Sequence, residues 1–342
     1  MVHVRFKECR LQSLNARKNN DEEESSRNIH TNQRSYSLGM LLTFFAAFFW
    51  GSAYPVIKIT LQYYNAYEIS FLRAVLATLT LVAYYAVKRR KVLFIPHDRN
   101  TIILLLMATF LGAAGFWTLL NLSVLFLEPD TSSFLVALYP LLAVVLASIF
   151  LHDRMTLPRA MGVLAGIFGT YLIVWFGQGA GIAGVQPAVG IVVALLASFS
   201  WAGYMITTRI LIGKKDPKTG ILLGPEYVTF WTFLIATIPT LLIVLATSNI
   251  SNMTIETSGF GLVIYLGVFA SGVAFLMFNL GMKTIGVSSA AINQLLFPVI
   301  AVIISYFLFG ELLNIADLLG MGVIIVGIII AQSSTFSSSR NR

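Results

Sequence analysis

The sequence predicts an all-α polytopic membrane protein with ten transmembrane helices, arranged as two inverted repeats of five helices each. Three observations support this prediction. Only 11% of the 342 residues are charged and 57% are hydrophobic, whereas about 25% of residues are charged in a soluble domain. Apolar runs recur at about the 20-residue length that crosses a hydrocarbon core, and they are continuous, which excludes an alternating β-barrel. The chain also contains a long internal repeat.

The repeat is clearest in two stretches that begin with a proline and end with an acid. Residues 140–153 read PLLAVVLASIFLHD, and residues 298–311, which lie 158 positions later, read PVIAVIISYFLFGE. The same offset aligns residues 104–171 with 262–329 without a gap. With five spans in each copy, the second repeat must enter the membrane from the opposite side, which is a recurrent plan among transporters.

Ten apolar spans justify the helix count, and polar segments divide the chain around them. The spans lie at 38–58, 66–87, 101–124, 131–151, 158–177, 188–210, 224–247, 259–282, 288–309 and 315–334. The amino-terminal tail lacks the apolar core of a signal peptide. We therefore expect a disordered cytoplasmic tail at 1–37, a first repeat at 38–177, an external linker at 178–187, a second repeat at 188–334 and a cytoplasmic tail at 335–342.

The basic residues predict the orientation of these spans. If the amino terminus is cytoplasmic, 21 of the 23 lysines and arginines fall in cytoplasmic loops and tails. Such a bias is the usual determinant of membrane topology. We therefore expect both termini to be cytoplasmic, in a multi-pass protein of the plasma membrane. The formal charge of +8 is a topology signal on this interpretation, and no nucleic-acid partner is expected.

The titratable side chains argue against an enzyme. The single cysteine, Cys9, lies in the amino-terminal tail, and the four histidines lie in tails or loops without clustering. We therefore expect no metal site, no cofactor and no catalytic residue at membrane depth. A passive channel or a receptor could use the same bundle, and concentrative flux driven by a counter-ion would separate a transporter from both.

Polar residues within the spans are the candidate binding residues, because buried polar and charged groups are costly in a membrane. Arg73 lies about seven residues into the second span; its alternative role is that of a structural anchor. Asn121 and Asn279 occupy equivalent repeat positions, and Trp117 precedes Asn121 by four residues on the same helical stripe. These side chains suit a cavity for a partly polar solute. The amides could equally bond neighbouring helices together.

The ninth span adds further candidates near its proline. Asn293 and Gln294 precede Pro298 and could line the same cavity, and Tyr139 adds a hydroxyl beside Pro140. Each proline removes a backbone donor and frees a carbonyl upstream. Pro140 and Pro298 are therefore predicted hinges for gating, with a purely structural bend as the alternative.

Other residues of the spans are predicted to have structural roles. The aromatic residues Trp50, Tyr54, Trp201 and Tyr204 are typical of interfacial belts or packing, with pore lining as the less favoured alternative. Glycines with GxxxG-like spacing predict close packing of the fifth and tenth spans, either as a scaffold or as a dimer face; they are Gly162, Gly166, Gly169, Gly320 and Gly327. A monomer and a homodimer both remain open.

Several motifs resemble those of the drug/metabolite transporter superfamily, and in particular of ten-helix members with two EamA domains. They are Trp50-Gly51 in the first span, FLRA at 71–74 in the second, and the doubled proline-to-acid stretches. The resemblance implies a basket-like bundle with a central cavity and alternating access. His152-Asp153 departs from the Gly-Glu that is common in the first copy of the family. Four-helix relatives carry a glutamate in the first span, and none is present here.

The resemblance implies the export of amino acids or related small metabolites by secondary transport. The expected partners are a small-molecule substrate, the lipid bilayer, and a coupling ion or counter-substrate. The alternative is an antiporter of nucleotide sugars or sugar phosphates on the same fold. That activity would call for several cationic side chains in the cavity, and only Arg73 and Lys283 are placed to help.

Overall fold

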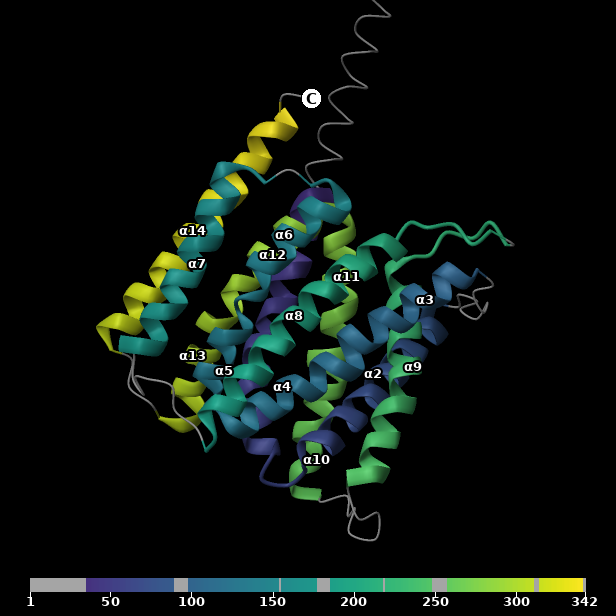
Figure 1. The fold of residues 1–342 in the computed structure, drawn as a ribbon, viewed down its shortest axis with the longest axis horizontal. Helices are drawn as coiled ribbons and strands as arrows, with labels where there is room; N and C mark the ends of the chain where they lie inside the picture. The colour runs from purple at the N-terminus through teal and green to yellow at the C-terminus, as the bar shows by residue number, and fades with distance from the viewer. Residues whose placement is uncertain are drawn as a thin grey trace, which may run out of the picture.

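The computed structural model describes residues 35–88, 98–153, 155–176, 185–217, 219–247, 257–310 and 314–340. Figure 1 shows a bundle of oblique helices. Across the described ranges eight helices are long and apolar enough to cross a membrane, and Ile315–Ala331 is a shorter apolar helix. The predicted all-α polytopic membrane fold is confirmed. An isolated antiparallel bridge between Lys215 and Leu222 is the β-structure found in this part of the chain.

Each predicted span coincides with one continuous or broken helix. The first repeat consists of Ser35–Thr60, α2 (Ala66–Lys88), α3 (Arg99–Ala108) with η1 (Thr109–Ala114) and α4 (Gly115–Phe126), α5 (Pro129–Val136) with α6 (Tyr139–Leu151), and α7 (Leu157–Phe176). The second consists of α8 (Pro187–Leu211), α9 (Pro225–Thr247), α10 (Thr257–Ile264) with η3 (Tyr265–Val273) and α11 (Ala274–Ile285), α12 (Val287–Asn293) with η4 (Gln294–Leu296) and α13 (Phe297–Phe309), and α14 (Ile315–Arg340).

Backbone irregularities recur at the repeat spacing. The third span of each half contains a π-helix, η1 in one and η3 in the other. The fourth span of each half breaks just before its proline. That same span ends in a left-handed residue, which is His152 (φ 54°) in the first half and Gly310 (φ 69°) in the second. The two halves therefore share one backbone plan, including its π-helices, helix breaks and left-handed residues.

The π-helices connect the halves to each other. A π-turn bonds each N–H five residues back, which displaces carbonyls from the regular helical ladder. The Ser200 hydroxyl donates to the Leu111 carbonyl of η1 at 2.8 Å, and the Trp50 indole N–H donates to the Ala270 carbonyl of η3 at 2.9 Å. Each carbonyl is thus bonded by the first helix of the opposite repeat. Unsatisfied backbone groups are costly in a membrane, so these bonds stabilise the irregular turns.

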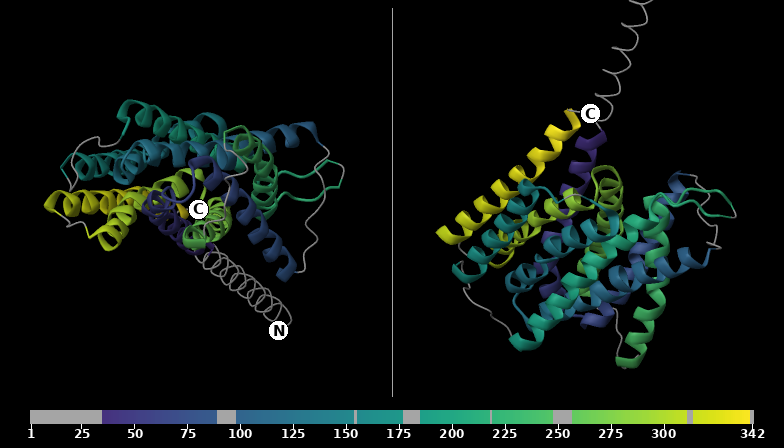
Figure 2. Two further views of the ribbon diagram at one scale, coloured as in Figure 1. Left: turned by 90° about the horizontal axis from the view of Figure 1, so that it is seen from below. Right: turned by 45° about the horizontal axis from the view of Figure 1, so that its top comes forward.

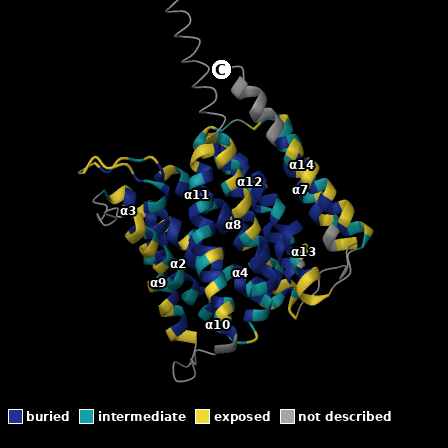
Figure 3. Ribbon diagram, turned by 180° about the vertical axis from the view of Figure 1, so that it is seen from behind, coloured by how far each residue is buried: buried dark blue, intermediate teal, exposed yellow. Residues whose placement is uncertain are grey.

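Equivalent aromatic residues of the two halves touch at the centre of the bundle. Trp117 and Phe275, and likewise Tyr139 and Phe297, are 158 positions apart, and Trp50 and Trp201 match because each follows a glycine, Gly39 or Gly190, by eleven residues. The ring centroids of Trp50 and Trp201 lie 4.9 Å apart, those of Trp117 and Phe275 5.4 Å, and those of Tyr139 and Phe297 6.1 Å. Residues related by a pseudo-two-fold axis can touch only close to that axis. The axis of the repeat therefore passes through this aromatic cluster, where buried residues concentrate (Figure 3).

Helices α7 and α14 form a peripheral pair (Figures 1 and 2). A Cβ atom added at Gly162 would lie 2.4 Å from the Cβ of Ala331, and one added at Gly169 would lie 2.5 Å from the Gly320 carbonyl oxygen. Only glycine permits this approach of the two backbones. The predicted close packing of the fifth and tenth spans is therefore observed within one chain, and a homodimer stays an expectation.

A polar contact outside the spans joins the start of α3 to the α8–α9 connection. The Asp98 carboxylate accepts from Lys214 at 2.6 Å and also caps α3 by accepting from the backbone N–H of Thr101. These bonds, chiefly the one from Lys214, lower the pKa of Asp98 to about 2. The carboxylate is therefore charged at neutral pH, and the contact loses strength only in strong acid.

Candidate functional site

A small cavity lies inside the aromatic cluster at the interface of the two halves. It is lined by Trp50, Ala53, Tyr54, Arg73, Phe116, Leu120, Val136, Tyr139, Trp201 and Phe297. Its volume is about 20 Å³, and a cavity of about that size holds a single water molecule. Side chains therefore fill most of the space that a solute would need.

Arg73 brings a fixed positive charge to this cavity. Its side chain is 1% exposed, and its guanidinium lies 5.0 Å from the centre of the Trp117 ring, in cation–π geometry. The Nε atom donates to the Ser271 hydroxyl at 3.0 Å, and Ser271 in turn donates to the Leu266 carbonyl at 2.8 Å. Ser271 belongs to η3, so the π-helix of the second half holds the arginine of the first.

No side chain that the structure describes neutralises the charge on Arg73. Among the described residues no carboxylate pairs with it, and its Nη1 atom is buried without a hydrogen-bond partner. A buried unpaired charge is strongly destabilising, and an unsatisfied charged donor adds to that cost. Glu68, near it in sequence, instead accepts from the backbone N–H of Asn65 at the start of α2. The arrangement is therefore complementary to an anionic group of a ligand.

Aromatic rings form the rest of the wall. Phe297 stacks on Tyr54 with centroids 5.4 Å apart and planes 6° apart, and it stacks in the same way on Tyr139. Trp201 closes another side by packing edge-on against Trp50. Such a wall can bury apolar groups and can contribute hydroxyl donors from tyrosines. Charge at one point and aromatic surface around it suit a carboxylate with an apolar substituent.

The structure brings three of the seven predicted binding residues together. Arg73 and Tyr139 line the cavity, and Trp117 lies behind Arg73. Asn121 lies apart, with its amide nitrogen donating to Ser70 at 2.9 Å and to the Ala66 carbonyl at 3.2 Å, so it bonds α4 to α2.

Asn279 takes the equivalent position in the second half. Its amide nitrogen donates to the hydroxyls of Tyr204 and Thr229, both at 2.8 Å, and bonds α11 to α8 and α9. Asn121 and Asn279 thus make the inter-helix bonds that the sequence left as their alternative role. In both residues the amide oxygen is buried without a partner.

The two polar residues of the ninth span contact the first helix instead of the cavity. Gln294 donates to the Thr43 carbonyl at 2.8 Å. Asn293 donates to the Thr43 hydroxyl at 2.7 Å and to the Met40 sulfur at 3.3 Å. The prolines occupy the first turns of their helices, α6 for Pro140 and α13 for Pro298. That position tolerates proline because the missing N–H would have no helical partner. Their role as hinges stays a prediction.

Some residues that form the site were not selected from the sequence. Trp50, Tyr54 and Trp201 line the cavity and do not form an interfacial belt. The matched tryptophans of the first and sixth spans were the signal, because equivalent residues of inverted repeats can meet on the axis. Ser271 was also missed, since a serine beside a glycine in an apolar span is common and a π-helix leaves no clear mark in the sequence.

Asp153 and Glu311 are the acids that end the two proline-to-acid stretches. Asp153 accepts from Arg159 at 3.0 Å and from the Ser288 hydroxyl at 2.5 Å, so it joins the end of α6 to α12 of the other half. Glu311 lies outside the described residues. Across those residues no group of histidine, cysteine and acidic side chains is arranged to hold a metal ion.

Comparison with protein families identifies the class of protein. The sequence model of the EamA-like transporter family matches residues 37–175 and, a second time, residues 188–332. The two matches cover most of the chain. The protein belongs to the EamA-like transporter family, within the drug/metabolite transporter superfamily, and is a multi-pass membrane transporter.

Individual relatives are similar over most of their length. "Uncharacterized transporter YyaM" of Bacillus subtilis (strain 168) is 25% identical over 299 residues, which covers 86% of this chain and 92% of the relative. "Probable terminal-alkyne amino-acid exporter" of Streptantibioticus cattleyicolor is 26% identical over 293 residues, with 85% and 92% covered. A solved crystal structure superposes with a TM-score of 0.72 at 18% identity, covering 86% of this chain and 96% of that one. The last similarity concerns the fold alone.

Proposed function

We propose that this protein is a secondary active transporter that exports amino acids or related carboxylate-bearing metabolites. The observation that carries the proposal is Arg73, a buried guanidinium that lacks a carboxylate partner and has a free Nη1 atom inside an aromatic cavity. A solute carboxylate would supply the missing acceptor, and aromatic rings would surround its apolar part. The relative named as a probable amino-acid exporter supports the same class of solute.

Alternating access is the proposed mechanism. The site lies between two halves that share a backbone plan, and the cavity of about 20 Å³ is too small for an amino acid. The halves must therefore separate on one side or the other to admit a solute. The breaks before Pro140 and Pro298 and the two π-helices are the places where the spans can change shape.

The alternative substrate class, nucleotide sugars or sugar phosphates, is less well supported. A phosphate carries more charge than a carboxylate and is usually bound by several cationic groups. Among the described residues Arg73 is the one basic side chain that is buried, and Lys283 is exposed. We also propose that the protein resides in the plasma membrane with both termini cytoplasmic, on the strength of its basic cytoplasmic loops.

Counterflow in proteoliposomes tests the substrate class. Vesicles are preloaded with individual neutral amino acids, with the corresponding amino acid amides, or with sugar phosphates, and exchange of the matching labelled solute is followed. The proposal predicts accelerated exchange for one or more amino acids and none for their amides, which lack the carboxylate. Exchange confined to sugar phosphates would contradict it, as would flux that does not accelerate when a counter-substrate is present.

A further inference from the structure

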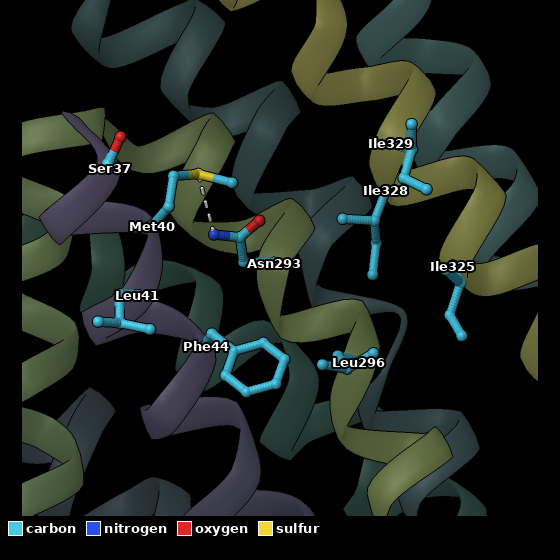
Figure 4. A pocket seen from close by; sticks show the side chains of 9 residues that line it. All are labelled: Ser37, Met40, Leu41, Phe44, Asn293, Leu296, Ile325, Ile328 and Ile329. Atoms are coloured by element: carbon cyan, nitrogen blue, oxygen red, sulfur yellow. Dashed lines mark hydrogen bonds between the residues drawn. The ribbon is translucent and has the colours of Figure 1, made fainter. Parts of the chain in front are cut away.

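A second and larger cavity opens at the side of the bundle, away from Arg73. It is a groove of about 460 Å³ between the first helix, the α12–η4 turn and α14 (Figure 4). This lateral groove is lined by Ser37, Met40, Leu41, Phe44, Asn293, Leu296, Ile325, Ile328 and Ile329. Its volume lies within the range of about 300–1,000 Å³ that is typical of sites for small ligands.

Two glycine contacts explain why the groove exists. A Cβ atom on Gly281 would lie 2.7 Å from the Gly39 carbonyl oxygen, so the first helix is held tightly against α11. A Cβ atom on Gly162 would lie 2.5 Å from the Gly327 carbonyl oxygen, so α14 is held tightly against α7. Because the first helix and α14 are each drawn toward a different partner, a gap remains between them.

The chemistry of the lateral groove excludes a charged occupant. No charged side chain lines it, and its other members are apolar apart from Ser37 and Asn293. The Asn293 amide nitrogen is turned to the first helix, where it donates to the Met40 sulfur (Figure 4). It also donates to the Thr43 hydroxyl on the same helix. Ser37 stands in the first turn of the helix, at the end of the groove. A ligand for this site is therefore a hydrocarbon chain with its polar end near Ser37.

The bilayer can supply that chain, whereas the adjoining part of the protein does not. Residues 1–34, which lead into the first helix, contain seven lysines and arginines and an acidic run, and such a segment has little hydrocarbon to bury. The rim of the groove is continuous with the lipid-facing surface: Leu41, Phe44 and Ile329 are 50%, 46% and 63% exposed. In a membrane protein these side chains contact acyl chains.

We propose that the lateral groove binds one acyl chain of a membrane phospholipid, with the ester and headgroup end at Ser37. The first helix advances about 10 Å from Ser37 to Phe44 at 1.5 Å per residue, which is about a third of a hydrocarbon core of about 30 Å. A chain that runs from the interface toward the bilayer centre matches this path. The bound chain fills the gap between the first helix and α14 and so joins the peripheral pair, α7 and α14, to the bundle.

Native mass spectrometry of the full chain tests this site. The protein is purified in detergent with added dioleoyl phosphatidylcholine and then depleted of lipid in steps. Ile328→Trp and Leu41→Trp fill the groove from opposite walls, and Leu319→Trp adds the same side chain on α14 at a residue that is 60% exposed and outside the groove. The wild type and the control are expected to retain one phospholipid, with occupancy at least tenfold lower in both groove variants.

The other outcomes overturn the proposal. Equal lipid retention in the control and in both groove variants would show that the lipid binds elsewhere, and absence of retained lipid from the wild type would show that the groove does not hold a chain. A lipid-free wild-type dimer that Ile328→Trp converts to a monomer would assign the groove to a second copy of the protein. Thermal melting confirms that each variant is folded. None of these results depends on the transported solute.

Discussion

The two halves of the transporter share a backbone but differ in the chemistry placed on it. Helix α2 packs against η3, and its counterpart α9 packs against η1. In the first contact Arg73 meets Ser271; at the equivalent positions of the second stand Trp231 and Ala113. The duplicated fold therefore provides two crossings between the halves, and only one of them carries a charge. The inverted repeat therefore determines the shape of the centre, while Arg73 gives one of the two crossings a different chemistry from the other.

The largest expected effect comes from removing the charge of Arg73 from the contact between α2 and η3. Arg73→Leu should lower counterflow of the transported carboxylate at least about 100-fold, because it removes a charge-assisted contact worth about 3 kcal/mol. The matched control is Trp231→Leu, at the equivalent position in the contact between α9 and η1. This variant should retain most of the exchange. Similar losses in both variants, at equal levels of folded protein, would show that the two crossings matter only for packing.

A smaller effect is expected from the serine that holds the arginine. Ser271→Ala removes the acceptor for Nε of Arg73, so the guanidinium loses its fixed orientation. We expect the half-saturation concentration to rise about tenfold, consistent with one hydrogen bond to a charged group, with a much smaller change in maximal rate. Ser271→Thr keeps the hydroxyl and should retain affinity. Kinetics of labelled solute exchange measure both, and an Ala variant with wild-type affinity would exclude Ser271 as a positioning residue.

The equivalent asparagines give a comparison of stability. Asn279→Leu breaks bonds to two different helices, whereas Asn121→Leu breaks bonds to α2 alone. Inter-helix hydrogen bonds in membranes are worth about 0.6 kcal/mol each on average, with maxima near 1.7 kcal/mol. We expect Asn279→Leu to cost about 1–2 kcal/mol, and Asn121→Leu to cost less because one of its two bonds is long, at 3.2 Å. Reversible unfolding in mixed micelles measures the difference, and an equal cost in the two halves would contradict it.

The smallest effect concerns the left-handed residues that end the fourth span of each half. His152 adopts a φ of 54° that Gly310 adopts without strain at 69°. His152→Gly should stabilise the protein by up to about 1 kcal/mol, and Gly310→Ala should destabilise it by about 1 kcal/mol. Thermal melting of the two variants side by side tests this. A lower melting temperature for His152→Gly would show that the imidazole makes contacts that outweigh the strain.

The sequence predicted the fold because its signals are global. Hydropathy and the offset between Pro140 and Pro298 determine the helices and the inverted repeat wherever the side chains point. The site was harder to predict, since each candidate was chosen for polarity within an apolar span. Asn121 and Asn279 are polar residues of this kind, but their amides bond neighbouring helices, and the amide of Asn293 bonds the first helix. Arg73 met the same criterion, and only the three-dimensional structure shows that its Nη1 atom has no partner.

The aromatic residues that line the cavity were also difficult to predict from the sequence. Trp50 and Trp201 resemble interfacial tryptophans when each is considered alone, and their contact across the axis follows only from how the halves dock. The π-helices that permit this docking depend on carbonyls bonded by the opposite repeat, at Leu111 and Ala270. No local sequence pattern specifies such a bond. Equivalent aromatic residues in an inverted repeat are therefore worth testing as axis residues in other sequences.

Equilibrium binding to the purified transporter tests most directly whether Arg73 receives the carboxylate of the solute. Affinities of a neutral amino acid identified by counterflow, and of its amide, are measured for the wild type and for Arg73→Gln. We expect the wild type to prefer the carboxylate at least tenfold, and we expect Arg73→Gln to abolish this preference while retaining weak binding of both ligands. An undiminished preference in Arg73→Gln would show that the carboxylate binds elsewhere in the protein.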